Sequence, residues 1–533
     1  MANVQLPVEL FQLIVESCPR PTRKTLLFVS KMFHDLALPL LFSRITLTFG
    51  IKRRPGRHWS RDDPWTEEET AQLSKYNSRS FAILQHLEQD ISLAKIVRSL
   101  SVRWYEFPFG RSTTLALEAV GRALSALSNL ESFEWRGNGH IIPQHAAEAL
   151  RRCENLRSLL ISPMQFLWPD LFELRKLTQI TLMVSLNEWI PSITNMPAAD
   201  RERYESALRL VDLNAASLED VTTSYWMFPS APLPKLKHAT FLRAIGATGL
   251  ERLIQHSPLL TSLTLTASAW NVDGILSAFA SSPEAFPHLT EFKFLVEYTH
   301  DMRDCDANPI AAFLQNKQHL RRLHLDLCSE QSQPIIRLLP KLPNLEDLGL
   351  GWGGMQFTAA RESLFADCLP RNLRALSIKL HEDRAVLEAF LRLIKQRPTL
   401  KVCYVSSLPY LSLEVLVGVL ADKECSVELV GVGNTLCYTC RPTNDTHHRN
   451  QLAGMHSLCD PDIDPSLTMA DYGLDGWQWL AQHGADLGEI TISSAVCSSD
   501  DVDARVLPLV DIVDLRPLEG SCYVLDHRGF GLD

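Results

Sequence analysis

The stretch Leu320-Arg321-Arg322-Leu323-His324-Leu325 decides the fold, because a similar stretch, Leu345-Glu346-Asp347-Leu348-Gly349-Leu350, follows 25 residues later. Successive side chains of a strand point to opposite faces, so the leucines at positions four and six share one face. One such strand cannot bury its leucines alone. It needs copies of itself on either side, which predicts a repeat protein.

Twelve copies of this pattern occur, with conservative substitutions, in the middle of the chain. Their first positions are Val97, Leu130, Leu156, Leu177, Leu218, Leu236, Leu260, Leu289, Leu320, Leu345, Leu373 and Leu400. Most steps are near the roughly 20–29 residues of a leucine-rich repeat, and stretches of helical periodicity fill the gaps. The sequence therefore predicts an α/β fold: over residues 91–430, a curved leucine-rich-repeat solenoid with one parallel sheet and outer helices.

The residues between the repeat leucines are expected on the concave side of this sheet. Many of them are charged, and position eight is aromatic in three copies. Aromatic and arginine side chains often anchor protein interfaces, although charges on a sheet face also serve solubility alone. The predicted substrate-binding residues are Trp104, Arg136, Tyr225, Lys293, Arg322, His324 and Trp352.

Residues 1–50 have the pattern of a small helical unit. Leu6-Pro7-Val8-Glu9-Leu10 places a proline where the first turn of a helix tolerates it, and apolar residues then recur at helical spacing up to Val15. Cys18-Pro19-Arg20-Pro21 interrupts this helix. A second apolar helix is expected to run through Ser30 and to end at Pro39.

The order of these features, LPxEL followed by L-L-x-V-S-K-x-F-x-x-L-A and a closing P-L-L-F, resembles the F-box, particularly that of fungal F-box proteins. The resemblance implies a three-helix module that docks on a Skp-type adaptor and, through it, on a cullin–RING ubiquitin ligase. It assigns this contact to Leu6, Pro7, Leu10, Ile14, Leu27, Val29 and Phe33. The repeat region likewise resembles the part of F-box proteins that binds a protein substrate. The alternative is an interaction scaffold without a ligase role.

Residues 51–90 are polar, charged and poor in aliphatic side chains, which predicts a linker and polar loop. The basic run Lys52–Arg57 is typical of a nuclear import signal or of a solvated loop. A net charge of −10 opposes non-specific binding to nucleic acid. Because neither a membrane-spanning run nor a secretory signal is recognisable, we expect an intracellular protein, cytoplasmic or nuclear or both.

Residues 431–533 depart from the repeat pattern and are expected to form a C-terminal cap or a small appended domain. They contain Cys437, Cys440, His447 and Cys459, residue types that can hold a structural zinc ion. One C-x-x-C pair without a second is a weak signal, so we expect no cofactor. Neither a nucleophile elbow nor a phosphate-binding loop is found, which favours an adaptor over an enzyme.

Overall fold

A computed structural model of the chain describes residues 7–51, 65–105, 111–137, 142–164, 168–184, 198–224, 229–244, 247, 249–268, 272–297, 306–327, 333–352, 365, 367–379, 393–394, 397–406, 427, 429–432 and 435–438. The chain divides into two compact units. Unit 1 comprises Met1–Phe241 and Thr248–Leu259, and unit 2 comprises Leu242–Ala247 and Leu260–Asp533. Each unit is described by itself.

Unit 1 begins with three helices, α1 (Val8–Ser17), α2 (Arg20–Leu26) and α3 (Lys31–Phe42). The hydroxyl of Ser30 accepts a hydrogen bond from the Phe33 amide at 3.3 Å and so caps α3. The expected continuous helix through Ser30 is therefore wrong. Pro39 also does not end the helix, since α3 continues to Phe42. A proline this near the end removes only a hydrogen bond of the last turn.

A small core joins these helices. Val15 and Ala37 are fully buried and Leu41 nearly so, and the rings of Phe11 and Phe33 meet edge to face at 5.6 Å. The Arg23 guanidinium donates a hydrogen bond from Nε to the Val15 carbonyl at 3.1 Å, near the C-terminal end of α1. Since so few side chains are buried among α1, α2 and α3, these three helices depend on the rest of unit 1 for stability.

Helix α4 (Glu67–Gln89) occupies much of the stretch expected to be a linker. Thr66 and Glu69 form a capping box, in which the Thr66 hydroxyl accepts from the Glu69 amide at 3.1 Å and the Glu69 carboxylate accepts from the Thr66 amide at 2.8 Å. Leu84 and Leu87 are buried, and the Ser80 hydroxyl hydrogen-bonds both the amide and the carbonyl of Thr48. The prediction of a polar loop over residues 51–90 is wrong for this helix. Residues 52–64, which include the basic run, lie outside the described residues.

The strands of unit 1 pair in chain order, each parallel to the next. They are β1 (Arg44–Phe49), β2 (Ser99–Trp104), β3 (Ser132–Gly137), β4 (Ser158–Met164), β5 (Gln179–Val184) and β6 (Asp220–Ser224). Between or after them lie α5 (Ile91–Ile96), α6 (Arg111–Ala126), α7 (Gln144–Arg151), the 3-10 helix η1 (Pro169–Glu173), α8 (Ala198–Asn214) and α9 (Leu250–His256). Strand β7 (His238–Ala244) contains a unit boundary. Because β1 belongs to this sheet, the repeat fold begins at Arg44, not at residue 91.

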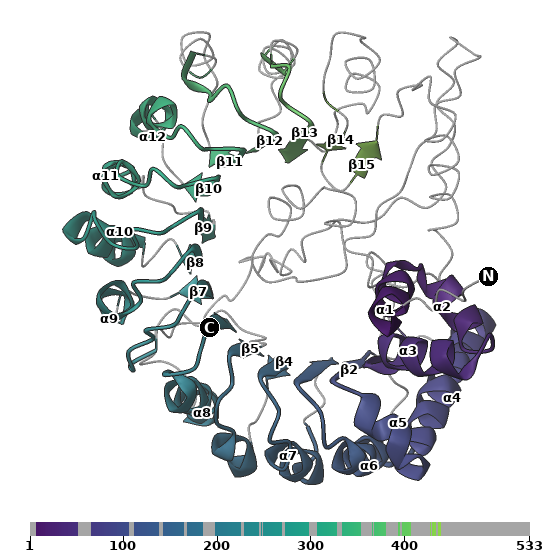
Figure 1. Cartoon of the computed structure of the whole chain (residues 1–533). Coiled ribbons are helices and arrows are strands. Elements are labelled where there is room, and N and C mark those ends of the chain that lie inside the picture. The colour runs from purple at the N-terminus through teal and green to yellow at the C-terminus, as the bar shows by residue number, and fades with distance from the viewer. Residues whose placement is uncertain are drawn as a thin grey trace, which may run out of the picture. The chain divides into compact units, whose positions relative to one another are not determined.

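Unit 2 continues the alternation of strands and helices, with the helices along one side of its strands (Figure 1). Its strands are β8 (Ser262–Ser268), β9 (Glu291–Glu297), β10 (Arg322–Leu327), β11 (Asp347–Trp352), β12 (Ala375–Lys379), β13 (Val402–Ser406), β14 (Leu429–Val432) and β15 (Thr435–Tyr438). Its helices are α10 (Val272–Ser281), α11 (Asn308–Leu314), α12 (Gln333–Leu338) and the 3-10 helix η3 (Leu339–Lys341). The pairings from β8 to β14 are parallel, whereas β15 runs antiparallel to β14.

The twelve sequence copies coincide with β2 to β13, so the predicted α/β strand–helix repeat is confirmed. In the copy at Leu320, the leucines at positions one and four are fully buried and Leu325 is 2% exposed. The Thr290 carbonyl accepts hydrogen bonds from both Arg321 and Arg322 amides, at 2.8 and 3.0 Å. The next repeat reproduces this arrangement. Each repeat is therefore fixed to its neighbour before the strand begins.

Candidate interaction surfaces

Helix α1 has two apolar faces. Phe11 and Val15, four residues apart, pack inward against α3. Other apolar side chains of α1 remain exposed, and so do two in the turn after α2. The exposed fractions are 56% for Val8, 43% for Leu10, 57% for Leu13, 49% for Ile14, 88% for Phe28 and 57% for Val29. Leu10, Leu13 and Ile14 share one face of α1 at i, i+3 and i+4 spacing, and we call these three residues the α1 patch.

The residues predicted to contact an adaptor separate into two groups. Pro7, Leu10, Ile14 and Val29 are exposed. Leu27 and Phe33 are half-buried, and they pack against the small core that joins the three helices. Leu6 lies outside the described residues. The structure thus brings most of the predicted docking residues to one small helical unit, with the α1 face at its surface.

In each unit the strands also present a polar face, made by positions three, five and seven of the repeats. In unit 2 its centre is an ion-pair ladder across β9, β10 and β11. The Arg322 guanidinium contacts Glu291 Oε1 through Nη1 at 3.0 Å and Asp347 Oδ2 through Nε at 3.0 Å. The Ser262 hydroxyl extends the ladder to β8, donating to Glu291 Oε2 at 2.9 Å. Two carboxylates therefore share one guanidinium.

Lys293 and His324 lie side by side in the next row of this polar face. They are only 2% and 3% exposed. Burial lowers the pKa of the Lys293 ammonium to about 7, although the nearby Glu291 carboxylate acts in the opposite direction. The predicted substrate residues Lys293, His324 and Arg322 are thus brought together, with the first two little accessible.

Two glycines of β11 make room for these side chains. A Cβ atom on Gly349 would lie 2.6 Å from the His324 ring, and one on Gly351 would lie 2.2 Å from the Asp326 carboxylate. Since Gly349 and Gly351 are the register partners of His324 and Asp326, both side chains lean over the bare backbone of the neighbouring strand. The glycines fix where the imidazole and the carboxylate lie.

Trp104 was predicted at the rim of the surface, and this is wrong. Its indole is fully buried, with ring centroids 4.8 Å from Phe49 and 5.8 Å from Trp135. Position eight has the same parity as positions four and six, so its side chain points into the core. Of Trp352 only the backbone is described, at the end of β11, and Tyr225 lies outside the described residues.

The polar face of unit 1 carries Arg136 on β3, as predicted, and also Arg103 on β2, which the sequence reasoning did not single out. The two are register partners on neighbouring parallel strands. Glu134, two residues before Arg136, forms an ion pair with it. Position seven of the repeat was the signal that would have found Arg103.

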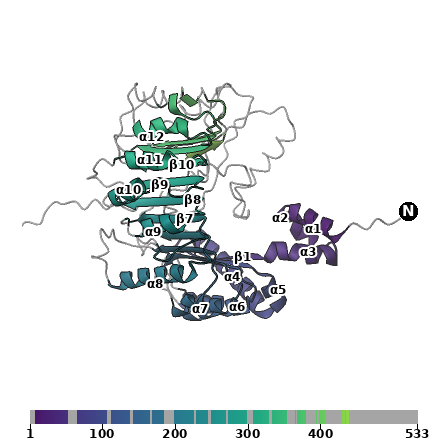
Figure 2. The same cartoon turned by 60° about the vertical axis from the view of Figure 1, so that its left-hand side comes forward.

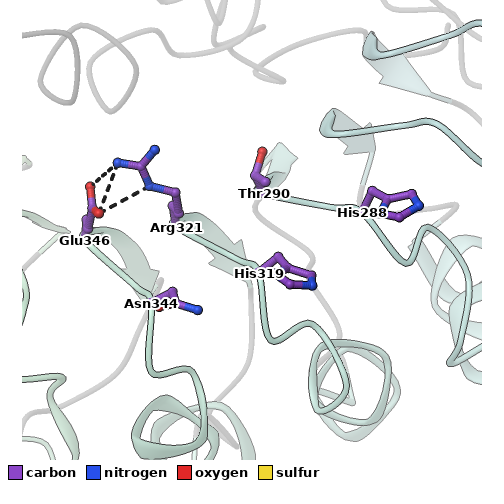
Figure 3. A pocket seen from close by; sticks show the side chains of 6 residues that line it. All are labelled: His288, Thr290, His319, Arg321, Asn344 and Glu346. Atoms are coloured by element: carbon purple, nitrogen blue, oxygen red, sulfur yellow. Dashed lines mark hydrogen bonds and ion pairs between the residues drawn. The ribbon is translucent and has the colours of Figure 1, made fainter.

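A shallow pocket of about 390 Å³ lies where β9, β10 and β11 begin. Figure 3 shows its six lining side chains, His288, Thr290, His319, Arg321, Asn344 and Glu346. Arg321 and Glu346 form a bidentate pair at 2.8 to 3.2 Å, and the Thr290 hydroxyl donates to the Thr261 carbonyl at 3.0 Å. Because the Thr290 hydroxyl donates to a backbone carbonyl, it is not activated as a nucleophile, and the pocket lining offers hydrogen-bonding groups.

The cysteines of the described residues do not form a metal-binding group. Cys153 is buried, which raises the pKa of its thiol to about 11 and disfavours the nucleophilic thiolate. Cys437 lies in β15, whereas Cys440, His447 and Cys459 lie outside the described residues. Within the described part of the chain, no three His, Cys, Asp or Glu side chains gather to hold a metal ion. There too, no helix combines the length and apolarity needed to cross a membrane.

Comparisons with known proteins add little to this geometry. No protein-family model matches the chain, and no curated protein matches it. Solved structures do match, among them the crystal structure of an internalin C2 from Listeria monocytogenes. It is 15% identical, with a TM-score of 0.24, over 43% of this chain and 83% of that chain.

Proposed function

We propose that the chain is a substrate-recruiting subunit of a Skp–cullin–F-box ubiquitin ligase. Its N-terminal helices dock on the Skp-type adaptor, and its repeats hold a protein target. The F-box resemblance of Leu6 to Phe42 motivates the first half, and the strand–helix repeats motivate the second. The chain performs no chemistry itself in this proposal.

The α1 patch is the observation that carries the proposal. A helix that packs Phe11 and Val15 inward on one side needs no apolar residues on its other side, yet Leu10, Leu13 and Ile14 lie there. Fully burying one such side chain gains about 1.5–3 kcal/mol, so this face is suited to a partner. An amphipathic helix entering an apolar groove is a common mode of recognition.

The polar faces that the strands present in unit 1 and in unit 2 supply the surface for the target. They combine arginine forks with carboxylates and hydroxyls, groups that select a partner by charge and hydrogen bonding. Ubiquitin transfer then follows from proximity, because a target held by a subunit that is docked on the ligase experiences a high effective concentration of the ligase.

Co-purification with a Skp-type adaptor tests the docking half. The triple variant Leu10→Ala/Leu13→Ala/Ile14→Ala removes most of the exposed apolar face of α1, and alanine preserves the helix. We expect wild type to retain the adaptor and this variant to lose it. The matched control is Ile91→Ala/Leu115→Ala, which removes two apolar side chains that are 63% and 59% exposed on other helices. It should retain the adaptor fully.

Equal recovery of the adaptor with wild type and the triple variant would refute this docking mode. The same triple variant separates a ligase subunit from a plain scaffold. In cells it should capture the same target as wild type while that target accumulates, because the ligase is no longer delivered. A target whose abundance does not change would support a scaffold without a ligase role.

A further inference from the structure

The residue before the first leucine of a repeat has a recurring structural role, and unit 2 departs from it at two histidines. In several repeats this residue is asparagine or threonine, and its side chain donates a hydrogen bond of 2.7 to 3.5 Å to a backbone carbonyl of the preceding repeat. The donors are Asn129, Asn344, Asn372 and Thr399. His288 and His319 occupy the same position, but within the described residues neither ring forms a hydrogen bond or an ion pair.

The two histidines belong to neighbouring repeats. His288 lies three residues before β9 and His319 three residues before β10, and these strands run side by side, with Glu291 the register partner of Arg322 (Figure 2). Neighbouring strands are about 4.8 Å apart, close to the roughly 5–6 Å between residues four apart on a helix. At that helical spacing two histidines share one zinc ion in H-E-x-x-H sites. One ion can therefore reach both rings.

Both rings line the pocket of about 390 Å³ where these strands begin. Figure 3 shows them pointing to the same side, away from the Arg321–Glu346 pair. The other lining side chains are engaged within the protein. Arg321 and Glu346 hold one another, and Thr290 and Asn344 donate to backbone carbonyls. The two imidazoles are therefore the groups of this pocket that a ligand can engage without breaking a hydrogen bond.

The chemistry of two adjacent imidazoles favours a metal ion over an anion. A neutral imidazole has a nitrogen lone pair, and this nitrogen is a preferred ligand of Zn²⁺, Ni²⁺ and Cu²⁺. Mg²⁺ and Ca²⁺ prefer carboxylate oxygens, but the Glu346 carboxylate of this pocket is held by Arg321. An anion would require charged rings, and like charges on neighbouring strands repel each other.

We propose that His288 and His319 bind one divalent transition-metal ion, each through one ring nitrogen, with water in the remaining coordination positions. Both side chains are exposed, so an ion reaches them from solvent. The inference does not depend on the proposed function, because neither the N-terminal helices nor a protein target takes part in it.

Isothermal titration calorimetry of the purified, tag-free full chain with Ni²⁺ tests the proposal. Nickel suits imidazole, whereas zinc would also be drawn to cysteine thiolates elsewhere in the chain. The variants His288→Asn and His319→Asn introduce the residue that Asn344 and Asn372 provide at this position, so the repeat should keep its fold. Equal thermal unfolding temperatures of the metal-free proteins check this.

We expect wild type to bind Ni²⁺ at a site that each single variant weakens by at least about tenfold. Even a change behind a metal ligand costs about 10–100-fold in affinity, and here a ligand itself is lost. The double variant should be no weaker than either single variant, because one imidazole alone cannot chelate. His86→Asn is the control: it removes an exposed histidine from the last turn of α4 and should leave the affinity unchanged.

Three results would overturn the proposal. One is wild type that binds no Ni²⁺ below about 1 mM, or binds it as well as the double variant does. Another is a loss in each single variant that is only half of the loss in the double variant, which would indicate two independent rings without a shared ion. The third is an equal loss with His86→Asn, which would indicate adventitious binding to surface histidines.

Discussion

The ring of Phe49 packs against the indole of Trp104, with centroids 4.8 Å apart, and this contact joins the strand that follows the N-terminal helices to the first predicted repeat. Both side chains are fully buried, and Trp135 continues the aromatic stack at 5.8 Å from Trp104. The core of the sheet therefore begins inside the first fifty residues, and a deletion of residues 1–50 would remove part of it.

Phe49→Ala should lower the free energy of unfolding by about 3–5 kcal/mol, because it leaves a cavity beside Trp104 and Phe81. Urea denaturation followed by tryptophan fluorescence measures this. Phe28→Ala, at a site 88% exposed, should change stability by no more than about 0.5 kcal/mol. Equal losses for the two variants would show that the stack does not hold β1.

Arg321 and Arg322 are adjacent in sequence but should differ in their effect on stability. Arg321→Ala removes an edge pair whose arginine is 58% exposed, which costs at most about 1 kcal/mol. Arg322→Ala leaves Glu291 and the nearly buried Asp347 without their shared guanidinium, so we expect a loss of about 1–3 kcal/mol. Thermal unfolding of both variants checks the order. A larger loss for Arg321→Ala would contradict the ladder.

Lys293 should make stability depend on pH. Its pKa is about 7 in the folded chain and near 10.5 when exposed, so between these values the unfolded chain binds the extra proton. The free energy of unfolding of wild type, minus that of Lys293→Met, should therefore rise between pH values of about 7 and 9. The expected slope is up to roughly 1.4 kcal/mol per pH unit. Urea unfolding at three pH values measures it, and Lys317, whose pKa is about 8, is common to both proteins. A flat difference would contradict a buried ammonium.

Gly349→Ala should destabilise unit 2, because the new methyl group would lie 2.6 Å from the His324 ring. Combining it with His324→Ala should recover part of the loss, since the added methyl then has space. A double-mutant cycle with thermal unfolding gives this coupling, with about 0.5–3 kcal/mol expected for side chains in contact. Additive effects would show that His324 does not lie over the glycine.

The twelve repeat strands could be predicted because alternation and spacing are properties of the local sequence. The same alternation, applied to positions seven and eight, would have placed Arg103 on the polar face and Trp104 in the core. Helix α4 was not predicted because its charged composition is typical of a linker, although Thr66 and Glu69 have the spacing of a capping box. By contrast, the approach of His324 to Gly349 depends on which strands are neighbours, so no single stretch reveals it.

The burial of Lys293 likewise followed from no pattern in the sequence. Its neighbours in the strand, Phe292 and Phe294, point to the opposite face, so position five predicts an exposed ammonium. The prediction of exposure fails because burial depends on everything packed around the site. Of the predicted adaptor residues, Pro7, Leu10, Ile14 and Val29 are exposed and Leu27 and Phe33 are half-buried, while their contact with an adaptor stays a prediction.

Helix α3 ends at Phe42 and β1 begins at Arg44, with Ser43 between them. The Ser43 carbonyl accepts hydrogen bonds from the amides of Arg98 and Ser99 at 2.8 and 2.9 Å, so even this junction is held in the sheet. In the proposed ligase, the docking helices would therefore be joined rigidly to the first strand of unit 1, and not through a flexible linker. The geometry of this junction would set the position of the target relative to the ligase. Inserting a few glycines after Ser43 would make the junction flexible and lower the effective concentration of the ligase at the target, without changing either binding surface.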